Sequence, residues 1–538
     1  MSAVLDSWIQ RHQQKDLLRF LTCGSVDDGK STLIGRLLYD TDLVPEDQLA
    51  AVAKDSERHG TTGKGVIDLA LLTDGLKAER EQGITIDVAY RYFSTDKRKF
   101  IIADCPGHQQ YTRNMATGAS SCQVAIILID ARHGVQEQTR RHAFIVSLLG
   151  IRHVVVAINK MDLVGWSEAA FLRIREDFLA FARRLDLPDI AVVPVSALDG
   201  DNVVHCGGAS PWYAGPTLLT HLETVPVADD VDHEHFRFPV QLALRPNLDF
   251  RGFAGTVVSG VIRVGDAVMN AASRKRSRVK GLTVAGEPAA IAYAPQAAVI
   301  QLADEIDCSR GDMLVRPDDA PPLVQRAEAM LVWMQEEPLR LRHTYWVRTS
   351  VGYVPGQVAA INHAVDVNSL EHRSASELQL NHIARVTLEL ARPIPVDPYV
   401  RNRATGSFVL VDRGSNATAA AGMLQSLEAN GSIDASSPAQ RARLLGHGGA
   451  VVAMGAAANP ARLEAVADAL LRRGIAAVWL HPSRLPAADL AALAAELAAQ
   501  GQVVLAAIPG SVPEGEPEQA AEAIARQVAN DGGADFTI

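Results

Sequence analysis

Residues 24–31 read Gly24-Ser25-Val26-Asp27-Asp28-Gly29-Lys30-Ser31, which matches the Gly-x-x-x-x-Gly-Lys-Ser pattern of a phosphate-binding loop. The apolar run 17–21, broken only by Arg19, predicts a strand before the loop, and the run 32–38 predicts a helix after it. In such a unit, backbone N–H groups and the helix N-terminus converge on an anion. Lys30 is then expected to reach the β- and γ-phosphates, and the Ser31 hydroxyl to bind Mg²⁺. Thr32 completes the candidate phosphate site.

Length and composition restrict the class of protein. The 538 residues predict three or four domains, and the formal net charge of −10 gives no overall electrostatic footprint for nucleic acid or an anionic membrane. Five scattered cysteines lack a Cys-x-x-Cys spacing, so neither a disulfide framework nor a zinc site is expected. Residues 1–16 are polar, and no apolar run is long enough to cross a bilayer. We therefore expect a cytoplasmic chain that binds neither nucleic acid nor a membrane.

The segment 17–225 alternates apolar runs with helical patterns. Continuous apolar runs at 99–103, 124–129 and 153–158 are typical of parallel strands buried on both faces, and the stretches 138–149 and 167–185 are amphipathic. This pattern predicts a doubly wound α/β domain with its ligand site at the carboxyl ends of the strands.

Three further motifs follow predicted strands. In Asp104-Cys105-Pro106-Gly107, the Asp can hold Mg²⁺ through water and the Gly N–H can approach the γ-phosphate. In Asn159-Lys160-Met161-Asp162, the Asp162 carboxylate can accept hydrogen bonds from N1–H and the exocyclic amine of guanine, and Asn159 and Lys160 would hold the loop and the base plane. Ser196-Ala197-Leu198 can supply a backbone donor to the guanine oxygen. Four motifs in this order predict a GTP-binding domain.

Two segments resemble the switches of translational GTPases, namely Gly83-Ile84-Thr85-Ile86-Asp87 and Asp104-Cys105-Pro106-Gly107-His108. The resemblance implies that Thr85 completes the Mg²⁺ shell and that the Gly107 N–H senses the γ-phosphate. It also implies that His108 orients the attacking water. Lys30, Thr85, Gly107 and His108 are therefore the candidate catalytic residues, and Ser31, Thr85 and Asp104 the candidate metal residues.

Longer phrases narrow the resemblance to the large GTP-binding subunit of bacterial sulfate adenylyltransferase, over about residues 16–423. The phrases are residues 74–83, 111–120, 130–135 with 138–142, and 212–219. This family implies that GTP hydrolysis is coupled to formation of adenylyl sulfate and pyrophosphate from ATP and sulfate. It also implies a small catalytic partner subunit that binds ATP and sulfate, in a heterodimer or higher heteromer. The alternative is an elongation-factor-like GTPase that delivers aminoacyl-tRNA; the acidic balance and the phrase 138–142 disfavour it.

The chain changes character after residue 230. Short alternating strands with Gly turns from 236 to 316 predict a small antiparallel barrel, and a second β-rich stretch from 325 to 423 resembles the third, barrel-like domain of the same family. The basic run Arg274-Lys275-Arg276, with Arg278 and Lys280, favours a solvated hairpin over a nucleic-acid site because no aromatic residues interleave it. The expected boundaries are a tail at 1–16, the GTP-binding domain at 17–230, barrels at 231–320 and 321–423, a linker at 424–448, and a last domain at 449–538.

The last domain reads as a second, small parallel α/β unit. Strands are expected at 450–454, 475–480 and 502–507, with helices at 460–472 and 487–499. The layout resembles a shortened form of the kinase that some relatives carry to phosphorylate adenylyl sulfate. Its phosphate loop would fall at 455–462, where Pro460, Ala461 and Arg462 replace the second Gly, the Lys and the Ser. We therefore expect this domain to lack kinase activity.

Overall fold

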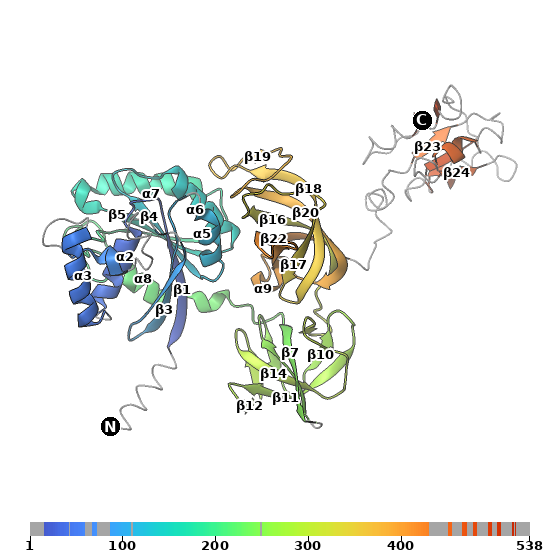
Figure 1. Ribbon diagram of the computed structural model, residues 1–538, viewed down its shortest axis with the longest axis horizontal. Coiled ribbons are helices and arrows are strands. Elements are labelled where there is room, and N and C mark those ends of the chain that lie inside the picture. The colour runs from blue at the N-terminus through green and yellow to red at the C-terminus, as the bar shows by residue number, and fades with distance from the viewer. Residues whose placement is uncertain are drawn as a thin grey trace. The chain divides into compact units, whose positions relative to one another are not determined.

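The structure is a computed structural model that forms two compact units, residues 1–428 and 429–538, each described by itself (Figure 1). In the first unit it describes residues 15–41, 44–59, 67–72, 85, 87–108, 111–247 and 250–428, and in the second unit residue 429 and short segments between 450 and 524. Most of the first predicted switch, the stretch 74–83 and the predicted loop 455–462 lie outside the described residues. No helix among the described residues is long and apolar enough to span a membrane.

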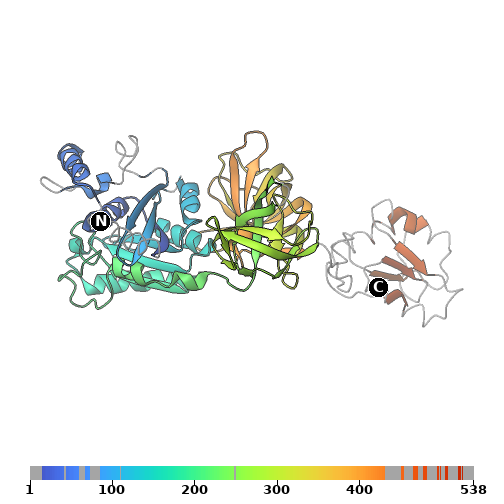
Figure 2. The same cartoon turned by 90° about the horizontal axis from the view of Figure 1, so that it is seen from below.

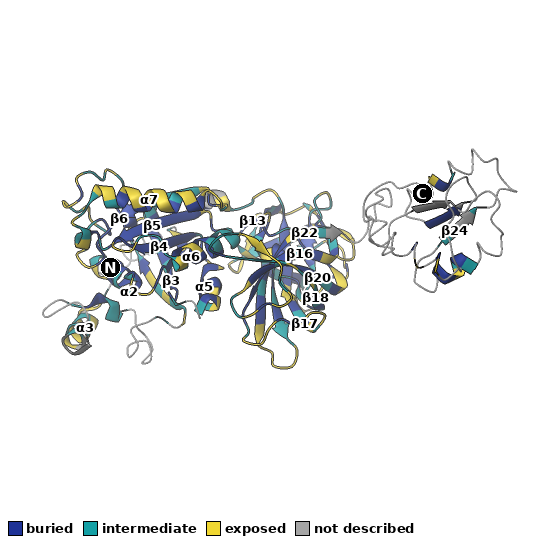
Figure 3. Ribbon diagram, turned by 90° about the horizontal axis from the view of Figure 1, so that it is seen from above, coloured by how far each residue is buried: buried dark blue, intermediate teal, exposed yellow. Residues whose placement is uncertain are grey.

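The first domain is built on a six-stranded sheet in the order β2-β3-β1-β4-β5-β6. All pairings are parallel except that of β2 with β3. Every residue of β4 and β5 is buried, as Figure 3 shows, because helices cover both faces of these continuous apolar strands. The predicted doubly wound sheet is confirmed. Its strands are β1 Asp16–Cys23, β2 Ala89–Ser94, β3 Arg98–Asp104, β4 Val124–Asp130, β5 His153–Asn159 and β6 Asp189–Pro194.

Two apolar cores lie on the two faces of this sheet. Helices α5 (Thr112–Ala119), α6 (Glu137–Leu148) and α7 (Glu168–Ala182) bury their apolar residues in one core. Helices α2 (Lys30–Asp40) and α8 (Leu218–Thr224) bury theirs in the other. Among the described residues, this domain also has the helical segments α3 Glu46–His59, η1 Leu69–Leu72, η3 Met161–Val164 and η4 Val227–Asp230.

The second domain is an antiparallel barrel, as predicted. Six strands follow one another around it in the order β10-β15-β7-β8-β14-β11, and pairing of β10 with β11 closes the ring. β12 (Glu287–Ala289) adds to β11, and β9 (Val261–Arg263) pairs with β13 (Ile291–Tyr293). The barrel strands are β7 Arg237–Asn247, β8 Phe250–Thr256, β10 Ala267–Asn270, β11 Arg276–Val284, β14 Ala297–Leu302 and β15 Met313–Val315.

The third domain is a second closed barrel, in the order β17-β21-β22-β16-β20-β18, with β17 paired to β18. The buried Arg237 joins the two barrels, since its guanidinium donates to both oxygens of Asp397 at 2.9 and 3.0 Å. Figure 2 shows the barrels side by side in green and orange. The elements are β16 Leu323–Trp333, β17 Thr344–Thr349, β18 Gly352–Val365, β19 His372–Arg373, β20 Ile383–Pro395, α9 Arg403–Gly406, β21 Ser407–Asp412 and β22 Thr418–Ala429.

The barrel ends later than the sequence suggests. Residues 424–429, assigned to the linker, instead continue β22. Leu424 is buried in the barrel core, and its carbonyl accepts the Tyr399 N–H at 2.8 Å. The polar, Ser/Ala-rich composition that follows hides this last strand segment.

The second unit contains a three-stranded parallel sheet in the order β23-β25-β24, as the sequence predicts. The strands are β23 Ala450–Ala453, β24 Ala477–Leu480 and β25 Val503–Ala506. Val503 and Leu505 of β25 pack with Val466 and Leu470 from a helical segment in the small core of this unit.

Candidate functional site

The phosphate-binding loop lies between β1 and α2. The Lys30 ammonium donates to the carbonyls of Gly24 and Ser25 at 3.2 and 2.7 Å, so it lies within the loop. Asp28 closes the loop from the other side, where its carboxylate accepts the Ser25 N–H at 2.6 Å. Burial lowers the pKa of Lys30 and raises the pKa of Asp28, and the attraction between the two charges opposes both shifts. The loop therefore holds a cation beneath the N-terminus of α2.

The segment after β3 packs directly on this loop. A Cβ on Gly107 would lie 2.4 Å from Lys30 Nζ and 2.7 Å from the Gly24 carbonyl, so only glycine fits at this position. The Ser25 hydroxyl is buried and has no hydrogen-bond partner among the described residues. A cation, a closely apposed glycine and an unsatisfied hydroxyl at a helix N-terminus form a cradle suited to phosphate oxygens.

Residues predicted for the metal lie around this cradle. Ser31 and Thr32 are half-buried in the first turn of α2, and Asp104 is buried at the end of β3, where its carboxylate accepts the Thr22 hydroxyl at 3.3 Å. No group of three or more His, Cys, Asp or Glu side chains with metal-binding geometry occurs in the described part. Hydroxyl and carboxylate oxygens are nevertheless hard ligands of the kind that Mg²⁺ prefers, with phosphate and water completing its shell.

The remaining switch residues precede β2 or follow β3. Cys105 and Pro106 are buried, and His108 is half-buried with its ring 5.9 Å from the ring of Tyr111. Thr85 is half-buried, but both neighbours in the sequence lie outside the described residues. His108 thus lies four residues beyond the end of β3, and Thr85 four residues before the start of β2.

Asn159 ties three motifs together. Its amide donates to the Asp28 carbonyl at 2.8 Å, and its side-chain oxygen accepts the Ala197 N–H at 2.9 Å. Gly29 lies against the same amide, since a Cβ there would be 2.5 Å from Asn159 Nδ2, and its φ of 91° favours glycine. The phosphate loop, the Asn-Lys-x-Asp turn and the Ser-Ala-Leu segment are thus held in one structure.

Lys160 is held by an aspartate that lies outside the four nucleotide motifs, although the family phrase 130–135 begins with it. The Lys160 ammonium donates to the Asp27 carbonyl at 2.5 Å and lies 3.0 Å from Asp130 Oδ2. Asp130 is buried at the end of β4 and also receives the Arg132 guanidinium at 3.0 and 2.7 Å. Burial would raise the pKa of Asp130, but the hydrogen bonds from Arg132 and Lys160 outweigh it and hold the pKa well below its usual range. In the sequence, Asp130 is recognisable only as the charged residue that directly follows the apolar run 124–129.

The candidate base site lies beside these contacts. Asp162 follows the buried Met161 in η3 and is itself half-buried. Its carboxylate has no hydrogen-bond partner among the described residues. Ser196 and Ala197 are buried, whereas Leu198 is exposed. Arg36 of α2 donates to the carbonyls of Ala197 and Leu198 and so fixes this segment to the helix that begins at Lys30. An acceptor carboxylate beside a fixed backbone segment matches the donor and acceptor edge of guanine.

Comparison with known proteins agrees with this geometry. Residues 15–243 match the family described as the Elongation factor Tu GTP binding domain, and residues 326–425 match the GTP-eEF1A C-terminal domain-like family. The protein named sulfate adenylyltransferase subunit 1 from Laribacter hongkongensis is 58% identical over 438 residues, 81% of this chain and 91% of the relative. The chain belongs to the sulfate adenylyltransferase subunit 1 family.

Other relatives extend the comparison. Sulfate adenylyltransferase subunit 1 of Alteromonas mediterranea is 58% identical over 78% of this chain and 88% of its own length. The bifunctional enzyme CysN/CysC of Rhodopirellula baltica is 59% identical over 78% of this chain and 65% of its own length. A structure of sup35 complexed with GDP is 22% identical and covers 77% of this chain and 95% of its own, with a TM-score of 0.35.

The family phrase at 138–142 forms part of α6 behind the site. His142 is fully buried and its ring lies 2.8 Å from the Gln138 amide, while its Nδ1 has no partner among the described residues. Burial, with repulsion from Lys30 and Arg141, lowers the pKa of His142 to about 3. In this subunit 1 chain His142 is therefore a neutral packing residue beneath the nucleotide loop.

Proposed function

We propose that this chain hydrolyses GTP and thereby drives the formation of adenylyl sulfate and pyrophosphate from ATP and sulfate on a partner subunit. The observation that carries the proposal is the identity of 58% over 91% of a relative named sulfate adenylyltransferase subunit 1. The assembled phosphate and base sites support the choice of GTP. The phosphosulfate bond makes adenylyl transfer to sulfate unfavourable, so coupling to GTP hydrolysis supplies a chemical reason for the site.

Each site residue has a proposed role. Lys30 and the N–H groups of residues 24–32 bind the phosphates, and Asp162 with residues 196–198 selects guanine. Ser31, Thr85 and, through water, Asp104 would hold Mg²⁺, which when bound neutralises phosphate charge. The Gly107 N–H senses the γ-phosphate, and His108 orients the attacking water.

No covalent intermediate is needed in this mechanism. The chain's own groups act by position and by charge: Lys30 faces the phosphates from inside the loop, and Gly107 allows close approach of the second switch. Segments that order around the γ-phosphate and relax when it is lost would then carry the signal to the partner.

The proposed partner is the small catalytic subunit, which binds ATP and sulfate, in a heterodimer or higher heteromer. The experiment is to purify this chain with the small subunit of the same organism and to measure adenylyl sulfate formation with and without GTP. We expect GTP to raise the yield and the small subunit to stimulate GTP turnover. His108→Ala is expected to leave GTP affinity unchanged while slowing hydrolysis by about 10²–10⁴-fold.

Contrary outcomes are equally specific. Stimulation of GTP turnover by ribosomes rather than by the small subunit would favour the aminoacyl-tRNA delivery alternative. Equal loss of GTP binding and hydrolysis in His108→Ala would contradict the water-orienting role.

We also propose that the second unit lacks adenylyl sulfate kinase activity, because Pro460, Ala461 and Arg462 remove a backbone donor, the phosphate-binding cation and the metal-binding hydroxyl of its loop. The full chain incubated with ATP and adenylyl sulfate is expected to form no phosphorylated product. Product formation above that of a heat-treated control would overturn this proposal.

A further inference from the structure

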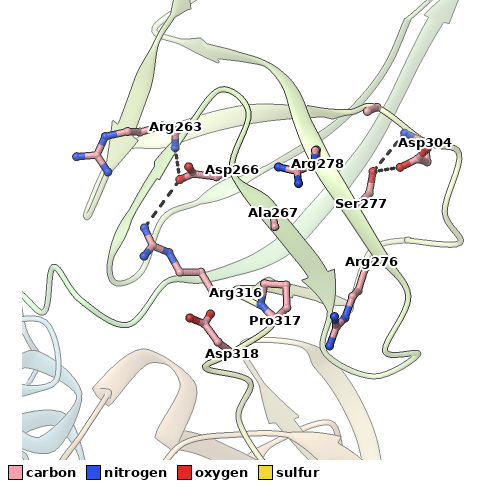
Figure 4. A pocket seen from close by; sticks show the side chains of 11 residues that line it. Arg263, Asp266, Ala267, Arg276, Ser277, Arg278, Asp304, Arg316, Pro317 and Asp318 are labelled. Carbon is pink, nitrogen blue, oxygen red and sulfur yellow. Dashed lines mark hydrogen bonds and ion pairs between the residues drawn. The ribbon is translucent and has the colours of Figure 1, made fainter.

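The first barrel carries a basic recess that the GTP site does not use. It has a volume of about 980 Å³ and is bordered by β9, β10, β11, and the segments that follow β14 and β15 (Figure 4). Ala267 of β10 forms part of its wall. Four arginines and three aspartates line it: Arg263, Arg276, Arg278 and Arg316 with Asp266, Asp304 and Asp318.

The arginines are incompletely neutralised. Asp266 accepts the Arg263 backbone N–H at 3.0 Å and lies 3.8 Å from the Arg316 guanidinium, while Asp304 accepts the Ser277 hydroxyl at 2.9 Å. The Arg278 guanidinium donates to a neutral carbonyl, that of Gly265, at 3.1 Å. Among the described residues, the guanidinium groups of Arg263, Arg276 and Arg278 form no ion pair. These three arginines therefore keep an unpaired positive charge, although three aspartates share the lining.

Strand geometry sets the spacing of this charge. Arg276 and Arg278 are exposed and flank the buried Ser277, so both project from the same side of β11, about 7 Å apart. Residues 274–280 hold five cations in a chain whose formal net charge is −10. The lining itself holds four arginines and three aspartates, so the excess of positive charge lies on the β11 side, where these five cations are gathered. Such a local excess attracts anionic groups despite the acidic balance of the whole chain.

The lining favours a peptide over a nucleic acid. No aromatic side chain lines the recess, so a nucleobase would have no surface on which to stack. Carboxylates two residues apart in an extended chain are also about 7 Å apart and match Arg276 and Arg278. Guanidinium groups bind carboxylates through paired hydrogen bonds.

We propose that this recess binds an extended acidic segment of the partner subunit, with carboxylates two residues apart facing Arg276 and Arg278. The identity of the occupant rests on the proposed function, which supplies the partner. The partner would then be held on a domain separate in sequence from the GTP-binding residues.

The test uses the full chain with both arginines reversed, Arg276→Glu with Arg278→Glu. The matched control, Arg245→Glu with Arg310→Glu, makes the same change in net charge at exposed positions of the same barrel outside the recess. Affinity for the small subunit is measured by calorimetry at low and high salt. We expect the recess variant to bind at least about 10-fold more weakly at low salt with a reduced salt dependence, and the control to bind within about twofold of the unmodified chain.

A second measurement identifies the occupant's chemistry. Hexaglutamate is expected to compete with the small subunit for the unmodified chain and to have no effect on the recess variant, whose GTP affinity and melting temperature match the control. Equal affinities of the two variants for the small subunit, failure of hexaglutamate to compete, or stronger competition by a single-stranded DNA oligonucleotide of equal charge would each overturn the site. Failure of the unmodified chain to bind the small subunit would instead contradict the proposed function, and with it the occupant.

Discussion

Replacing Asp130 with Asn tests whether an aspartate outside the nucleotide motifs positions Lys160. Asp130 is 1% exposed and receives Lys160 at 3.0 Å and the Arg132 guanidinium at 3.0 and 2.7 Å. The Lys160 ammonium also donates to Asp27 in the phosphate loop. The substitution preserves the shape of the side chain and one oxygen acceptor but removes the charge that orients both cations.

The expected magnitude follows from these contacts. A hydrogen bond to a charged group contributes about 1.5–3 kcal/mol. Because the Asp27 carbonyl still holds Lys160, we expect the loss of one such bond to appear in binding, so that GTP affinity falls by about 10–100-fold, or about 1.4–2.8 kcal/mol. Without the Asp130 charge between them, Arg132 and Lys160 repel each other, and this repulsion is expected to lower the free energy of unfolding as well.

The assay is titration of the chain with a fluorescent GTP analogue, together with urea unfolding. The control is Asp412→Asn, which changes a carboxylate of the second barrel that accepts hydrogen bonds from His343 and Ser415. The control is expected to destabilise its barrel while leaving GTP affinity within about twofold of the unmodified chain. Unchanged GTP affinity in Asp130→Asn, or an equal loss in both variants, would refute the positioning role.

The other predictions concern the cradle, the base and a buried histidine. Gly107→Ala is expected to weaken GTP binding at least about 10-fold, because its Cβ would lie 2.7 Å from the Gly24 carbonyl; unchanged affinity in the same titration would contradict this. Asp162→Asn should weaken GTP about 10–100-fold and favour xanthine nucleotides, and a retained GTP preference would refute the base assignment. Burial holds the pKa of His142 at about 3 in the fold, against 6.5 for an exposed histidine, so the unfolded chain binds more protons between these values. Its share of stability is present at neutral pH and falls by about 2 kcal/mol from pH 7 to pH 5, and urea unfolding should show that His142→Gln flattens this slope.

The sheet and its motif order could be predicted because each strand of the first domain is a continuous apolar run. The runs 124–129 and 153–158 became β4 and β5 with only one added residue each, since burial on both faces leaves little freedom for polar residues. The phosphate loop was equally predictable, because its glycines and lysine have fixed spacing.

The contacts that assemble the site could not be predicted in this way. Asp130 meets Lys160 because parallel β4 and β5 place Asp130 opposite Asn159, a register that no local pattern states. Arg36 reaches Ala197 across 161 residues of sequence, and Arg237 reaches Asp397 across 160. Composition also hid the last six residues of β22, because they lead without a break into a polar, Ser/Ala-rich stretch.

Helix α6 links the nucleotide site to the second barrel. Near its start, the Asn368 amide donates to Glu137 at 2.8 Å, and just beyond its end the Tyr399 hydroxyl donates to the Leu149 carbonyl at 3.0 Å. The barrel thus holds both ends of a helix that begins seven residues after Asp130, which itself holds Lys160. Because a hydrogen-bonded helix moves as a stiff unit, these two contacts resist a displacement of α6 relative to the barrel. These contacts form a contiguous path from Asp130 through α6 to the second barrel.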